Sequence, residues 1–186
     1  EIVYDKVQLP LIAEAYHMPA QGTADYYALS MLTTLLSGGE SSRFTKEIKD
    51  RQQKAVQVGS IPFSLEDPGL FFTYGLCNVG GKAEDLEAAI DAEIEKVKKE
   101  LVGVTEFQKI RNQIESSFVT RYSTVAGIGE SLANYSVYYG DPNLINTELQ
   151  RFMKVTREDL KRVANKYLTK ENRIVLYYLP KAMEKK

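Results

Sequence analysis

The sequence predicts an α+β fold, in which helices pack on one face of an antiparallel sheet. Three observations support this prediction. Segments with period-two alternation of apolar residues, typical of strands, occur near both ends and in the middle of the chain. Longer segments with apolar residues at helical spacing fill the remainder. The order strand, two helices, hairpin, helices, strand is neither a regular βαβ alternation nor an all-β pattern.

The first segments predict one strand and two helices. Apolar residues alternate with more polar neighbours as far as Pro19, which indicates a half-buried strand; they are Val7, Leu9, Leu11, Ala13 and Ala15. Thr23 is the expected N-cap of a helix over 24–37, which the glycines at 38 and 39 should end. A second, short helix is expected from Ser41 or Ser42 to about Arg51.

The middle of the chain predicts an antiparallel hairpin. Its strands are expected over 54–63 and 69–78, and the segment between them contains Pro68 and Gly69, which favour a chain reversal. The apolar residues assigned to these strands are Val56, Val58 and Ile61, then Leu70, Phe72, Tyr74 and Leu76.

The remaining segments are mostly helical. Helices are expected over 82–101, from a capping box formed by Thr105 and Gln108, and over 123–139. Another should begin at Thr156 with Asp159, before a closing strand with Ile174, Leu176 and Tyr178. Because no repeat or linker interrupts the chain, residues 1–186 are expected to form a single domain.

Composition excludes several function classes. The chain of 186 residues has a formal net charge of −1 and no basic stripe, so neither nucleic acid nor an anionic membrane is expected as a partner. No apolar run reaches the roughly 18 residues of a membrane span. The single cysteine, Cys77, excludes an internal disulfide framework and is expected to be a buried thiol.

Catalytic constellations are also missing. His17 is the only histidine, whereas a hydrolytic zinc site of the H-x-x-E-H type needs at least two imidazoles. No serine lies in a G-x-S-x-G turn, and neither glycine pair, at 38–39 or 80–81, belongs to a phosphate-binding loop. The acidic residues between Asp85 and Glu95 are interpreted as a solvated helix face. We therefore predict no catalytic residue and no metal site in this chain.

Tyrosine is abundant, with twelve residues and no tryptophan. Tyr135, Tyr138 and Tyr139 cluster in one predicted helix, and Tyr122 lies just before it. Such a surface could hold an extended peptide or a partner domain. Ordinary helix packing, with the hydroxyls reaching solvent, is the alternative interpretation.

The segment 35–48, LLSGGESSRFTKEI, resembles a stretch in the C-terminal homologous half of the pitrilysin/insulinase family of zinc peptidases. That family includes mitochondrial processing peptidase. The likeness also includes Tyr16-His17-Met18-Pro19 and the segment 25–29, and it continues through the hairpin, the helices and the final strand. It covers nearly the whole chain, and the order and spacing of the motifs make it specific.

The resemblance implies two homologous α+β halves that close around an unfolded peptide. Zinc would be held by an H-x-x-E-H domain in the other half, in the same polypeptide or another subunit. The half that resembles this chain commonly adds an arginine and a tyrosine, seven residues apart, that reach the zinc-bound substrate. Alignment with this pattern places Lys49 at the position of the arginine and Val56 at the position of the tyrosine. Valine has no hydroxyl group. Lys49, Arg51 and Arg43 remain as candidate substrate-binding residues.

Two functions follow from this resemblance. The domain is either the non-catalytic half of a working peptidase, which walls the peptide chamber, or a degenerate scaffold, as in the core subunits of the cytochrome bc complex. A third hypothesis is a free-standing binding module unrelated to peptidases. An uncovered hydrophobic face and self-association are expected. The family alone suggests the bacterial periplasm or cytoplasm, and no residue identifies the substrate.

Overall fold

The computed structural model describes residues 1–183 and is built on a five-stranded sheet with the strand order β1-β5-β2-β4-β3. The strands are β1 (Ile2–Asp5), β2 (Leu11–Met18), β3 (Ala55–Phe63), β4 (Gly69–Cys77) and β5 (Arg173–Pro180). Strands β5, β2, β4 and β3 pair antiparallel, and β1 adds a parallel pair at the edge through β5. The predicted α+β class and the predicted hairpin are confirmed, whereas β1 was not foreseen.

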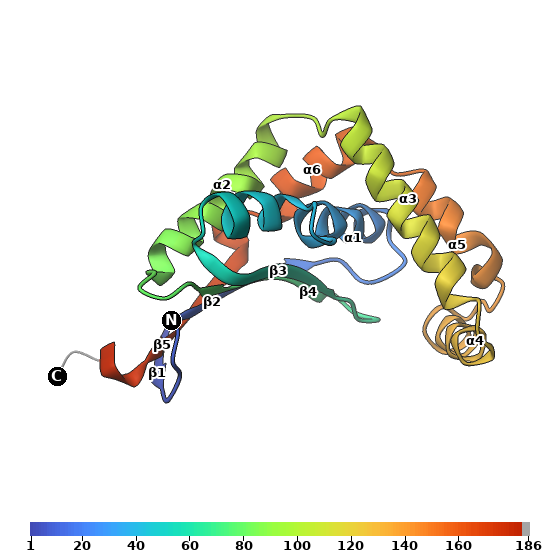
Figure 1. Cartoon of the computed structure of the whole chain (residues 1–186). Coiled ribbons are helices and arrows are strands. Elements are labelled where there is room, and N and C mark those ends of the chain that lie inside the picture. The colour runs from blue at the N-terminus through green and yellow to red at the C-terminus, as the bar shows by residue number, and fades with distance from the viewer. Residues whose placement is uncertain (184–186) are drawn as a thin grey trace.

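Helices cover one face of this sheet and extend beyond it, as Figure 1 shows. The α-helices are α1 (Ala24–Ser37), α2 (Ala83–Lys99), α3 (Val104–Arg121), α4 (Val125–Tyr139), α5 (Leu144–Met153) and α6 (Arg157–Tyr167). A short, wide π-helical segment, η1 (Thr45–Arg51), and two 3-10 turns, η2 (Lys170–Asn172) and η3 (Lys181–Met183), complete the fold. Among residues 1–183, no helix combines the length and the apolar character needed to cross a bilayer.

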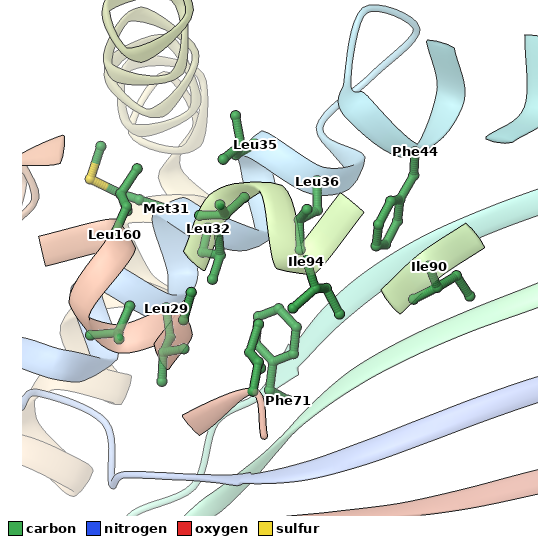
Figure 2. Packing of buried hydrophobic residues seen from close by; sticks show 14 of the residues in the cluster. Leu29, Met31, Leu32, Leu35, Leu36, Phe44, Phe71, Ile90, Ile94 and Leu160 are labelled. Carbon is green, nitrogen blue, oxygen red and sulfur yellow. The ribbon is translucent and has the colours of Figure 1, made fainter. Parts of the chain in front are cut away.

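The core forms where α1 lies between the sheet and the other helices. The side chain of Thr23 accepts a hydrogen bond from the Tyr26 amide at the start of α1, as predicted from its N-cap position. Figure 2 shows the leucines of α1 facing Phe71 of β4, Ile94 of α2 and Leu160 of α6, all of which are buried. Helix packing on one sheet face therefore accounts for most of the apolar burial.

Two helix predictions need correction. Helix α3 begins at Val104 with Gly103 as its N-cap, so Thr105 lies inside the first turn and forms no capping box with Gln108. Helix α5 was not predicted, although Leu144, Leu149 and Phe152 follow a helical spacing in its ten residues. The capping box of Thr156 and Asp159 at the start of α6 is confirmed, with reciprocal hydrogen bonds between them.

The alternating apolar residues of the strands mostly face away from the helices. In β2, the buried residues are Ile12, Glu14, Tyr16 and Met18, whereas Leu11, Ala13 and Ala15 lie on the opposite face. Cross-strand pairs place the other regular apolar positions on that same opposite face, because directly paired residues of a sheet share a face. They are Leu70, Phe72, Tyr74 and Leu76 of β4, Ile174, Leu176 and Tyr178 of β5, and Ile61 and Phe63 of β3.

Candidate functional site

The only histidine lies far from any metal-binding arrangement. His17 is exposed on β2, on the sheet face without helices, and is paired with Leu70 of β4. Among residues 1–183, one group of three acidic side chains has oxygens close enough to share an ion: Glu14, Glu87 and Asp91, within 4.8 Å of one another. This group is therefore the one to test for metal binding.

A guanidinium occupies the centre of that acidic group. Arg173 donates to Glu14 Oε1 at 3.2 Å, to Glu87 Oε1 at 2.8 Å and to Asp91 Oδ2 at 3.2 Å. Glu14 Oε2 also accepts from Tyr16 at 2.8 Å and from Thr73 at 2.6 Å. The carboxylates are thus saturated by protein donors, and the donor set fits a structural ion cluster that joins β2, β5 and α2 rather than a metal site.

Charge and burial act in opposite directions within this Arg173 cluster. Burial raises the pKa of Glu14, although hydrogen bonds from Thr73 and Tyr16 and the charge of Arg173 lower it. Burial also lowers the pKa of Arg173, but the hydrogen bond with Asp91 and the neighbouring anions outweigh it and raise that pKa. The interpretation of the acidic residues of α2 as a solvated face was therefore wrong for Glu87 and Asp91. It was also wrong for Glu93, which is buried and paired with Lys96.

The three predicted substrate-binding residues lie in or beside η1 but do not converge. Arg43 forms a two-pronged ion pair with Glu106 of α3, at 3.1 Å from Nε and 2.8 Å from the terminal nitrogen. Arg51 donates to Glu47 at 2.7 Å from its Nε. Lys49 is exposed, and within residues 1–183 its ammonium forms no ion pair. Of the three, Lys49 is the cation without an ion pair among residues 1–183.

The backbone from Lys49 to Val56 departs repeatedly from regular geometry. The wide turn of η1 closes with a hydrogen bond from the Gln52 amide to the Glu47 carbonyl, 3.0 Å long. Gln53 then has a φ of 51°, and a register shift between Ala55 and Gln57 forms a bulge in β3. Such irregularities gather at functional sites. The bulge leaves Val56 46% exposed on an edge strand.

Apolar surface remains uncovered in two places. Figure 1 shows no helix against the second face of the sheet, where Ile61, Phe63 and Ile174 are 50%, 54% and 64% exposed. Helix α4 projects beyond the end of the β3–β4 hairpin and exposes a second apolar surface. Its exposed apolar residues are Val125, Ile128, Leu132, Val137 and Tyr138. Exposed apolar residues that gather on one surface indicate an interaction surface.

The tyrosines of α4 have different environments. Tyr138 is half exposed, whereas Tyr135 is buried and donates to the carboxylate of Glu148 on α5. Tyr122 is hydrogen-bonded to Tyr135 at 3.0 Å between the hydroxyl oxygens. Glu148 was missed by sequence reasoning. Its signal is an acidic residue midway between Leu144 and Phe152, at the i+4 spacing that places all three on one helix face.

The cysteine is inert, as predicted. Cys77 is fully buried at the end of β4, and its amide donates to the Pro10 carbonyl at 2.9 Å. Burial, reinforced by the charges of Glu84 and Asp85, raises the pKa of its thiol to about 11. A thiol in this environment is neither a nucleophile nor a metal ligand near neutral pH.

Comparison with known proteins identifies the family. Residues 1–114 match the family described as the peptidase M16 inactive domain. The zinc protease PqqE of Helicobacter pylori is 30% identical over 176 residues, which cover 95% of this chain and 39% of that protein. The chain thus belongs to the peptidase M16 family as one of its inactive domains, which confirms the family suggested by the sequence. It is non-catalytic on its own.

Solved structures share the fold. A protease from Helicobacter pylori has a TM-score of 0.91 and 29% identity, covering 97% of this chain and 43% of that chain. A structure from Bordetella parapertussis, described as an inactive peptidase domain, shares the fold with a TM-score of 0.82 at 22% identity and covers 99% of this chain and 96% of its own. The chain spans 39% or less of the length of the curated relatives that it matches.

Proposed function

We propose that this domain is the non-catalytic half of a zinc peptidase. In this proposal it walls the peptide chamber and pairs with a homologous H-x-x-E-H domain, which holds the zinc. The observation that carries the proposal is the uncovered apolar face of the sheet, formed by regularly alternating residues of β5, β2, β4 and β3. An apolar sheet face of this kind is typical of a surface that packs against another domain. The chain matches only 39% of the length of a zinc protease relative. This supports a second domain, in the same polypeptide or assembly, that packs against the uncovered face.

Pairing can be tested by co-expression with the candidate H-x-x-E-H domain, followed by co-purification and a peptide degradation assay. We expect the two domains to co-purify and the mixture to cleave an unfolded peptide. Phe63→Ser with Ile174→Ser, two exposed positions at opposite sides of the uncovered face, should abolish co-purification and leave the isolated domain folded. Glu66→Ser, in the exposed β3–β4 turn, is the matched control and should co-purify normally. Retention of the pairing by the double variant would contradict the proposal.

Within the pair, we propose that Lys49 contacts the peptide. The supporting observations are its exposure, its lack of an ion pair among residues 1–183, and the irregular backbone that follows it. Lys49→Ala should lower turnover of the assembled peptidase, whereas Lys6→Ala, in the loop between β1 and β2, should not. An unchanged rate for Lys49→Ala would show that Lys49 is an ordinary surface lysine. Arg43 and Arg51 are weaker candidates, since both already pair with glutamates.

The scaffold function is supported by one sequence feature. In the alignment that the resemblance implies, Val56 stands at the tyrosine of the family pattern, and its side chain cannot donate a hydrogen bond to a developing oxyanion. Domains that pair but never cleave peptide, under conditions where the zinc-bearing domain is loaded with metal, would establish this alternative.

A further inference from the structure

A buried carboxylate at the junction of α3, α4 and α5 lacks a cationic partner. Glu148 is 5% exposed and accepts a hydrogen bond at Oε2 from the hydroxyl of Tyr135, which is 3% exposed. Because the Tyr135 proton points to Glu148, Tyr122 must donate to the Tyr135 oxygen, 3.0 Å away. The three side chains thus form a directed hydrogen-bond chain that ends on one oxygen of a carboxylate.

The second oxygen of this carboxylate is unused. Within residues 1–183, Glu148 forms no ion pair, and Tyr135 supplies its one hydrogen bond. Burial raises the pKa of Glu148, and the Tyr135 hydrogen bond and the charges of Arg121 and Arg151 only partly oppose that shift. A buried anion without a bonded cation is costly to a folded protein. A donor from a ligand would relieve this cost.

Glu148 lies in the wall of a polar cavity of about 410 Å³. The cavity is also lined by a second carboxylate, that of Glu130, by the amide of Asn134, and by the rings of Tyr26 and Tyr139. Gly22, with a φ of 84°, lets the loop before α1 approach the Tyr139 ring: a Cβ at Gly22 would lie 2.9 Å from Tyr139 Cε1. Aromatic rings beside a carboxylate are the elements by which proteins bind organic cations.

We propose that this cavity binds one cationic side chain, the guanidinium of arginine or the ammonium of lysine. The cation would donate to Glu148 Oε1, contact the rings of Tyr26 and Tyr139, and be shielded at the rim by Glu130. Arg121, which also lines the cavity, does not fill this role, because its guanidinium lies over the Phe118 ring, 5.6 Å from the centroid. The two carboxylates outnumber this one cation.

The identity of the carrier rests on the proposed function: the cation would belong to the peptide held in the chamber, and the cavity would select peptides with a basic residue. The affinity of the cavity for a free cation does not depend on that function. A small probe tested on the isolated chain therefore separates the two proposals.

The experiment titrates the chain with Nα-acetyl-argininamide and, in parallel, with Nα-acetyl-citrullinamide, an uncharged analogue of nearly the same shape. Binding is followed by the ring resonances of the tyrosines in NMR spectra. We expect the arginine probe to bind at least about tenfold more tightly, since a charge-assisted hydrogen bond contributes about 1.5–3 kcal/mol, and to shift the Tyr139 resonances. Equal affinities for the two probes would overturn the proposal.

Two variants locate the site. Glu148→Gln should abolish the preference for arginine, whereas Glu115→Gln, which removes a carboxylate from an exposed position of α3, should preserve it. Glu130→Gln, at an exposed position, keeps the test valid if Glu148→Gln fails to fold, and should weaken the arginine probe about threefold. A preference that survives both Glu148→Gln and Glu130→Gln would contradict the assignment. If the chain binds the arginine probe selectively but does not pair with a zinc-bearing domain, the proposed peptidase function is wrong and the proposed cation site stands.

Discussion

Two glutamates of this domain are buried to nearly the same extent but differ in what surrounds them. Glu14, on β2, is fully buried and accepts from Thr73, Tyr16 and Arg173, so both of its oxygens are used. Glu148, on α5, is 5% exposed and accepts from Tyr135 alone. Burial of a charged side chain therefore does not by itself identify a functional residue. The difference lies in the hydrogen bonds, and Glu148 also lines a cavity.

The largest effect is expected when the cation of the saturated cluster is removed. Arg173→Met leaves Glu14, Glu87 and Asp91 close together without their shared cation, and we expect a loss of about 3–5 kcal/mol in the free energy of unfolding. Urea denaturation measures it. Arg51→Met is the control, because Arg51 is 66% exposed and its pair with Glu47 should contribute less than about 1 kcal/mol. Similar losses for the two variants would show that the Arg173 cluster is not a structural centre.

A smaller effect is expected when Glu14 is replaced by the uncharged glutamine. In Glu14→Gln, an amide nitrogen that faces the guanidinium of Arg173 sets donor against donor, and one that faces Thr73 and Tyr16 forces these hydroxyls to accept instead of donate. We expect a loss of about 1–3 kcal/mol in the same assay. A variant as stable as the wild type would mean that the network tolerates an unsatisfied donor.

The smallest effect, of opposite sign, is expected at Glu148. Glu148→Gln removes a buried charge that has no bonded cation, so stability near neutral pH should be unchanged or rise by roughly 0.5 kcal/mol. The pKa of Glu148 is raised above its ordinary value of 4.5, so the folded state holds the proton more tightly than the unfolded state. This stabilisation is complete below about pH 4.5 and is lost as the pH rises through the folded-state pKa.

Wild type should therefore lose stability relative to Glu148→Gln as the pH rises from about 4.5. Parallel urea titrations of both proteins across this range measure the difference. A difference that stays constant with pH, or a destabilised variant at neutral pH, would place Glu148 with Glu14 as a saturated structural residue.

Sequence reasoning recovered the parts of the fold that depend on local signals. Thr23 and Thr156 cap helices because their hydroxyls reach amides three residues away, and the β3–β4 turn contains its own Pro and Gly. Strand alternation was also visible, but alternation does not say which face the helices cover. Here the regular apolar positions lie on the uncovered face, which only the tertiary structure could show.

The polar clusters could not be predicted because their members are distant in the chain. Arg173 meets Glu87 and Asp91, which helical spacing alone makes indistinguishable from the exposed acidic residues beside them. Glu148 accepts its hydrogen bond from Tyr135, which lies on another helix. For Lys49, the resemblance suggested only a place in a family pattern, and the structure adds exposure and an irregular backbone. Long-range pairing of polar groups thus limits what a single sequence reveals about a site.

Metal analysis of the purified chain, incubated with excess zinc and then dialysed, tests the central claim most directly when combined with a peptide cleavage assay. We expect far less than one zinc per chain and no cleavage, because the domain has one exposed histidine and Arg173 holds the acidic cluster of residues 1–183. One tightly retained zinc per chain, with hydrolysis of a peptide by this domain alone, would contradict the account.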